Sequence, residues 1–232
     1  QEARALSGLG DAYYAQGQMI KSYDHFQACV DFCRQHGLQH IEAGNRYMVA
    51  WLRQYLNDFS GAAEEAVLAV EAALIAGDRR AEILARVAVA CALSELGDLA
   101  GARAQIELGL AVVATVGALR FKPLYGIIEN RIGLAEGKPR PQLASAMEDA
   151  FETARETGIQ FVGPWVLSSL ALVSDDPERR RQALAEAEKL FQAGSVGHNL
   201  AIYSDAIEIS LADAAWDEVE RYCTALADYT RQ

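Results

Sequence analysis

The sequence has little of what nucleic-acid binding or strand formation requires. Only four of its 232 residues are lysines, and 21 basic residues stand against 32 acidic ones, a formal net charge of −11. A phosphate backbone would meet net repulsion, so we expect no nucleic-acid partner. Aromatic residues make up 8% of the chain while alanine dominates the apolar set, a balance that favours closely packed helices over strands.

Disulfide and membrane patterns are equally sparse. The four cysteines have no framework spacing and fall within expected helices, which is typical of a cytoplasmic protein. They are Cys29, Cys33, Cys91 and Cys223. We find no secretory signal and no 18-residue apolar run, so we expect no association with a membrane. Because the chain begins at Gln1 and is helical from the outset, we expect it to be a piece of a longer protein.

Catalytic motifs are also missing. The Gly8-Leu9-Gly10 segment lies inside an expected helix with no lysine nearby, unlike a phosphate-binding loop. Nucleophilic catalysis needs a histidine beside a serine or cysteine and an orienting acid, and the four histidines show no such partners. These histidines are His25, His36, His40 and His198. We therefore expect no catalytic residue and no cofactor.

One group of soft ligands invites a zinc interpretation. His25, Cys29, Cys33 and His36 recur at steps of four, four and three residues on one helix. They span roughly 16 Å along that helix, whereas the ligands of one tetrahedral ion lie about 4 Å apart, so at most two could share a metal. We expect Cys29 and Cys33 to pack against the neighbouring helix, and no metal site.

Glycines recur instead with a period near 40. One set has spacings of 40, 40 and 41 residues and comprises Gly37, Gly77, Gly117 and Gly158. A second set in the same period comprises Gly17, Asn57, Gly97 and Gly137. Glycine and asparagine most readily adopt the left-handed conformation that ends a helix, so Asn57 keeps the backbone role. Two helix ends per repeat predict one helical hairpin per repeat. The residues of the second set lie at the turns within hairpins, and those of the first set lie at the turns between hairpins.

Helix starts follow these stops. Asp58, Asp78 and Asp98 are placed to cap the next helix, and all five prolines fall at or near expected helix starts. Beyond Gly158 the spacing changes, with Gly194 and Gly197 separating the last two hairpins. The four helices expected there span 161–173, 178–193, 199–214 and 216–230.

The whole pattern predicts an all-α fold of twelve helices. We expect one domain, residues 1–232, forming a right-handed superhelix of about six hairpins.

The first hairpin resembles a tetratricopeptide repeat (TPR). The matching residues are Leu9-Gly10-Asp11-Ala12-Tyr13-Tyr14, then Gly17, Ser22 and Phe26. The resemblance implies that the small residues at the Gly10 and Ser22 positions let two helices approach closely. Later repeats place Ala50 and Ala90 at the Gly10 position and Ala62 and Ala102 at the Ser22 position, whereas the fourth places Asn130 at the Gly10 position.

Arrays with this longer period resemble the C-terminal helical regions of multidomain bacterial signalling proteins. These are class III adenylate or guanylate cyclases that carry an ATPase module, and LuxR-type ATP-dependent activators. The closing segment Ala214 to Tyr222 is similar to final hairpins of the cyclase type. No cyclase or ATPase motif is present in the chain itself.

The TPR resemblance also implies a partner groove lined by the first helix of each hairpin. The candidate residues are Asp11, Tyr14, Tyr47, Trp51, Gln54, Tyr55, Ser94 and Arg131. Tyr47, Trp51 and Tyr55 form a stripe at steps of four, and large aromatics with polar ends often anchor recognition surfaces. The alternative is that this stripe packs against the adjacent repeat. Arg131 could pair with a carboxylate of the partner.

Three functions remain open. The first is a non-catalytic scaffold that binds a partner protein or peptide, or another domain of its parent. The second is a small-molecule sensor that controls a LuxR-type activator. The third is self-association as a homodimer through a terminal repeat.

Overall fold

The computed structural model describes residues 1–192 and 199–231. Within them the chain forms twelve α-helices and one 3₁₀ turn, and no strand. The first six helices are α1 (Glu2–Ala15), α2 (Met19–His36), α3 (Gln39–Tyr55), α4 (Phe59–Ala76), α5 (Arg79–Glu95) and α6 (Leu99–Val116). The all-α fold is confirmed.

The second half begins with the 3₁₀ turn η1 (Leu119–Phe121). It continues with α7 (Lys122–Ala135), α8 (Arg140–Thr157), α9 (Ile159–Val173), α10 (Pro177–Gln192), α11 (Asn199–Ala212) and α12 (Trp216–Arg231). The expected helix bounds agree to within a few residues. The turn expected at Gly194 and Gly197, and the expected helix end at residue 193, lie outside the described residues.

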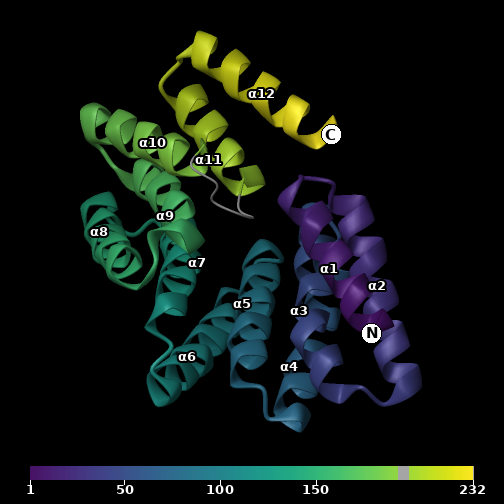
Figure 1. Cartoon of the computed structure of the whole chain (residues 1–232). Coiled ribbons are helices and arrows are strands. Elements are labelled where there is room, and N and C mark those ends of the chain that lie inside the picture. Colours follow the sequence, from purple (N-terminus) through teal and green to yellow (C-terminus); the bar gives the residue numbers. More distant parts are fainter. Residues whose placement is uncertain (193–198, 232) are drawn as a thin grey trace. The chain divides into compact units, whose positions relative to one another are not determined.

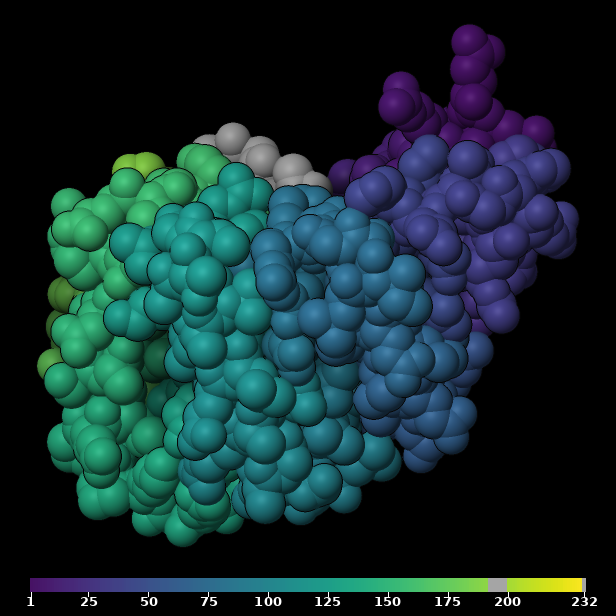
Figure 2. Space-filling view, turned by 90° about the horizontal axis from the view of Figure 1, so that it is seen from below, coloured from purple at the N-terminus to yellow at the C-terminus, as the bar shows by residue number. Residues whose placement is uncertain are grey.

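The contacts divide the chain into two compact units, Gln1–Ala118 and Leu119–Gln232. In unit 1 each helix packs on the next, and the first helix of each hairpin touches the first helix of the following one (Figure 1). Side chains close the spaces between neighbouring helices of this unit on the face seen in Figure 2. In unit 2, α9 contacts α7, α8, α10 and α11. A single domain spanning residues 1–232 stays a prediction.

The hairpin turns use the expected left-handed residues. Within hairpins, Gly17, Asn57, Gly97 and Gly137 have φ of 76°, 60°, 83° and 72°. Between hairpins, Gly37, Gly77 and Gly117 have φ of 66°, 67° and 67°. Gly158 departs from this geometry with φ of 132°, at the point where the glycine spacing changes. The roles assigned to the glycines are therefore confirmed up to Gly158.

The last hairpin turns at a residue that the glycine pattern does not mark. Ala214 has φ of 53° between α11 and α12, a conformation in which an L-residue is strained. We expect Ala214→Gly to raise the free energy of unfolding by about 0.5–1 kcal/mol, because the strain relieved exceeds the added chain entropy. Ala185→Gly in the middle of α10 is the control, and it should lower stability by a similar amount. Urea unfolding measures both, and equal effects in the two variants would contradict the assignment.

The three predicted helix caps are confirmed. The Oδ1 atoms of Asp58, Asp78 and Asp98 accept hydrogen bonds from the backbone N–H three residues on, at 3.0, 2.9 and 2.9 Å. Each bond satisfies one of the amides that a helix start leaves without a partner. These caps fix where α4, α5 and α6 begin.

Small residues set the spacing of the helices, as expected. A Cβ added at Gly10 would stand 2.8 Å from the Phe26 ring, and the Ser22 hydroxyl donates to the Gly10 carbonyl at 2.9 Å. The corresponding alanines are fully buried, at Ala50, Ala62, Ala90 and Ala102. Asn130 is also buried, and its amide donates across to the Ser169 carbonyl at 3.4 Å.

Two expectations about the helices need correction. Pro164 lies inside α9, five residues beyond its first residue, and not at a helix start. Gly163 precedes it without a Cβ, which removes part of the clash that a proline ring makes with the residue before it.

Helix α6, Leu99–Val116, is an 18-residue stretch with mean hydropathy 1.4, long and apolar enough to cross a membrane, although no such run was expected. Only 22% of it is buried, and one such helix is weak evidence of a membrane span.

Candidate functional site

The aromatic stripe of α3 meets α1 through a small hydrogen-bonded cluster. The Trp51 indole N–H donates to the Tyr14 hydroxyl at 3.1 Å, and the Tyr14 and Tyr55 hydroxyl oxygens lie 3.5 Å apart. The Trp51 and Tyr55 rings meet edge to face, with centroids 6.0 Å apart. The structure thus brings three of the candidate residues together on the face formed by α1, α3 and α5, which we call the first-helix face.

Trp51 also belongs to the packing between repeats. Its ring packs against a buried cluster of Ala50, Ala66, Ala88 and Val89, yet the residue is only half-buried. Gln54 reaches the next repeat, where its side-chain amide donates to the Ala88 carbonyl at 3.3 Å. Trp51 thus packs against the adjacent repeat, as the second interpretation of the stripe expects, and its role as an anchor for a partner stays a prediction.

A charged group extends the first-helix face. Burial raises the pKa of the Tyr47 hydroxyl, and the charge of Arg80 together with a hydrogen bond to it opposes this rise. Burial also raises the pKa of Asp11, while the charge of Arg80 acts in the opposite direction. Asp11, Tyr47 and Arg80 come from α1, α3 and α5, so one cation interacts with groups on two neighbouring helices. Ser94 is half-buried near the end of α5. The sequence offered no signal for Arg80.

Arg131 lies in unit 2 and has a carboxylate of its own. Its guanidinium forms an ion pair with Asp205 on α11, and the Ser168 hydroxyl on α9 donates to the same carboxylate at 2.7 Å. Asp205 is fully buried, and burial raises its pKa although Arg131 and Ser168 act against that rise. These three residues join the first helices of the unit's three hairpins.

Sequence reasoning missed Asp205, although the sequence contains a signal for it. The buried residues of α11 recur at helical spacing as Ile202, Ala206 and Ile209, and Asp205 falls within that buried stripe. An acidic residue among core positions is almost never left unpaired. The pattern therefore calls for a cationic partner, but it does not say that the partner is Arg131, 74 residues away.

The histidine and cysteine group is held by packing contacts. The Cys29 thiol donates to the Ala3 carbonyl at 3.2 Å, and Cys29 and Cys33 lie in one core cluster. The His25 ring stacks on Tyr13 with centroids 5.2 Å apart. Among the described residues, no three histidine, cysteine or acidic side chains are grouped so that they could hold a metal ion.

Thiol reactivity distinguishes these cysteines. Burial is the main cause that raises the pKa of Cys29 to about 12, so little of the reactive thiolate exists at neutral pH. Cys223 is exposed. We expect a pulse of N-ethylmaleimide on the native protein to label Cys223 and to spare Cys29 and Cys33, as mass spectrometry of the digested protein will show. Labelling in urea, where all four cysteines should react, is the control. Equal rates at Cys29 and Cys223 in the native protein would contradict this packing.

Comparison with known proteins identifies the fold and not a family. No protein-family model matches the sequence, and no curated protein matches it. A Rap protein in complex with competence and sporulation factor has a similar structure, with a TM-score of 0.73 and 15% identity. The match covers 99% of this chain and 64% of that one.

Two further crystal structures agree. The apo form of RapI gives a TM-score of 0.73 at 11% identity, covering 99% of this chain and 83% of RapI. Aspartyl phosphate phosphatase F from Bacillus subtilis gives a TM-score of 0.68 at 11% identity. The match covers 99% of this chain and 60% of that protein. The chain thus spans less than two thirds of two of these proteins. At these identities the likeness establishes an all-helical, TPR-like repeat fold.

Proposed function

We propose that this chain is a non-catalytic interaction module that binds a partner protein or peptide on the first-helix face of unit 1. The observation that carries the proposal is the cluster of Trp51, Tyr14 and Tyr55, in which the half-buried rings of Trp51 and Tyr55 meet the buried Tyr14 of the preceding repeat through their polar ends. Residues of this type supply large contact area at low entropic cost and dominate the energetics of many interfaces.

The net charge of unit 1 and the surroundings of Asp11 favour a partner with basic residues. Unit 1 contains 14 acidic and nine basic residues, a net charge of −5. Asp11 is exposed on this face, but neighbouring atoms keep water from part of its carboxylate and raise its pKa, so a cationic side chain of the partner would favour the charged form. Arg80 partly fulfils that role in the chain alone.

The similar structures support an interaction role without defining the partner. One of them is a Rap protein crystallised with a bound factor, and another is named as a phosphatase. For this chain we propose a cytoplasmic regulatory scaffold within a bacterial signalling protein, of the cyclase type that the sequence resembles. The LuxR-type sensor and the self-association module are the alternatives. The comparisons give no support to either kind of parent.

Site-directed cross-linking tests the proposal. Benzoylphenylalanine placed at Asp11 or Ser94 should cross-link a partner from an extract of the source cells, whereas the same group at the exposed Glu71 of α4 should not. The partner segment identified in this way is then synthesised and titrated by calorimetry. We expect Asp11→Asn and Gln54→Ala to weaken binding about tenfold each, with Glu71→Gln unchanged. A partner that binds all three variants like the native chain does not use this face.

A further inference from the structure

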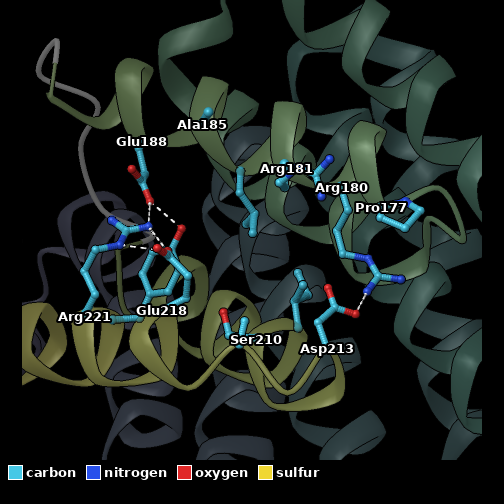
Figure 3. A pocket seen from close by; sticks show the side chains of 13 residues that line it. Pro177, Arg180, Arg181, Ala185, Glu188, Ser210, Asp213, Glu218 and Arg221 are labelled. Carbon is cyan, nitrogen blue, oxygen red and sulfur yellow. Dashed lines mark hydrogen bonds and ion pairs between the residues drawn. The ribbon is translucent and has the colours of Figure 1, made fainter.

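The last two hairpins of unit 2 depart from the packing seen in unit 1. In unit 1 the second helix of each hairpin packs along the first helix of the next, as α2 does on α3 and α4 on α5. In unit 2, α10 packs on α9 and barely touches α11, while α11 packs on α9 and α12. Between α10 and the α11–α12 hairpin lies a cavity of about 650 Å³ (Figure 3). This volume lies within the range of small-ligand sites in proteins.

Ion pairs bridge this cavity near both ends. At one end Arg180 of α10 pairs with Asp213, which follows α11. At the other end Arg221 of α12 pairs with Glu188 of α10 at 2.9 Å, and the Tyr222 hydroxyl donates to the same carboxylate. Figure 3 shows the two sets of side chains at opposite sides of the cavity. Long side chains therefore connect α10 to the hairpin where close helix packing would otherwise do so.

The cavity has opposite charge at its two ends. Near the start of α10, the charged lining residues are Arg180, Arg181 and Asp213, which together give an excess of positive charge. Near Arg221, Glu188 and Glu218 give an excess of negative charge. Apolar residues lie between these ends. They are Leu184, Ala185, Ile209 and Ala215. The N-terminus of α10 adds a partial positive charge at the arginine end.

We propose that this cavity binds an elongated zwitterion with an apolar middle, whose carboxylate lies at the arginine end and whose ammonium lies at the glutamate end. Arg180 and Glu188 are eight residues apart on α10, which corresponds to about 12 Å along the helix axis. An extended peptide advances about 3.3–3.6 Å per residue, so three to four residues span that distance. The occupant is therefore a tripeptide or tetrapeptide with free termini and small apolar side chains.

The charged groups at both ends can exchange partners at little cost. Arg181 pairs with Glu178 at 2.5 Å, but both side chains are mostly exposed, so the pair contributes little. Glu218 is half exposed and is held to Arg221 at 2.6 Å. Glu188 keeps the Tyr222 bond in the bound state because burial raises the pKa of that phenol, which remains a donor. The ligand's termini would take up the excess charge at each end without breaking the two bridges.

Calorimetric titration with Ala-Leu-Ala tests the proposal. The free tripeptide should bind, while N-acetylation or C-amidation should each weaken binding about tenfold or more, because each removes one terminal charge. The compound 8-aminooctanoate, which has opposite charges on an apolar chain but no peptide bonds, shows whether the ends alone suffice. Binding of the tripeptide alone identifies a peptide site, and binding of both identifies a general zwitterion site.

Variants locate the binding. Arg181→Gln and Glu218→Gln remove the excess charge at each end and should each weaken the free tripeptide about tenfold. Ala185→Trp fills the cavity from an exposed helical position and should abolish binding. Arg155→Gln and Glu186→Gln are exposed controls outside the cavity and should bind like the native chain.

The proposal is overturned if no zwitterion binds to the folded protein at millimolar concentration, if blocked and free tripeptides bind equally, or if Ala185→Trp binds normally. Because the site lies within unit 2, its failure would leave the proposed function of unit 1 untouched.

Discussion

Replacing Arg131 with methionine should lower the free energy of unfolding by about 3–5 kcal/mol at pH 7. Methionine keeps much of the packing of the arginine stem but leaves the fully buried Asp205 carboxylate without its counter-ion. Arg155→Met is the control, since its exposed pair with Glu152 contributes at most about 1 kcal/mol. Urea unfolding of both variants measures the difference, and an Arg131→Met loss no larger than the control would contradict a structural role for this ion pair.

The loss should depend on pH with a defined sign. Burial holds the pKa of Asp205 above its unfolded value, so its contribution to stability is greatest below that unfolded value and falls as pH rises through the folded pKa. Removing Arg131 raises the folded pKa further because the opposing charge is gone. Arg131→Met should therefore cost less at pH 4 than at pH 7. A loss that grows on acidification would show that the carboxylate is not the group affected.

The second large effect concerns the contact between α1 and α2 at Gly10. Phe26 is 1% exposed, and its ring packs on the backbone at Gly10. Phe26→Ala should cost about 3–5 kcal/mol, because it leaves a cavity between α1 and α2. Denaturant unfolding of the whole chain measures the loss. The reaction of Cys29 with a thiol reagent is the signal that unit 1 has unfolded.

A double-mutant cycle makes this prediction specific. Gly10→Ala in the native chain should destabilise, since the new Cβ would stand 2.8 Å from the Phe26 ring. In the Phe26→Ala background the same change should stabilise by up to about 1 kcal/mol, because the space is empty and alanine favours a helix over glycine. The effect of Gly10→Ala thus reverses sign. An effect of the same sign in both backgrounds would mean that the two residues do not meet.

Features set by local chemistry were predictable from the sequence. The left-handed turns at Gly17 and Asn57 and the cap at Asp58 each depend on a few neighbouring residues, so a repeated pattern along the chain located them. Pro164 and Ala214 show where local rules fail. One lies inside a helix and the other takes a strained turn, because the packing of unit 2 outweighs the local preference.

The functional surfaces depend on longer-range contacts. The sequence identified Trp51 and Tyr55 as a stripe, but their meeting with Tyr14 required the stacking of two repeats. It singled out Arg131 as a binding residue, whereas the fold pairs it with Asp205. The cavity beside α10 had no sequence signal, because it results from the loose contact of two hairpins whose charged side chains are ordinary for exposed helices.

The indole resonance of Trp51 tests the proposed binding face most directly. The chain has three tryptophans, of which Trp165 and Trp216 lie in unit 2, so three indole N–H signals in a nitrogen-15 correlation spectrum can be assigned with single Trp→Phe variants. The partner segment found by cross-linking is then titrated into the labelled protein. Binding on the first-helix face should shift the Trp51 signal, because its N–H bond to Tyr14 lies in the contacted cluster, and leave the Trp165 and Trp216 signals in place. A Trp51 signal that stays unchanged at saturation would contradict the account.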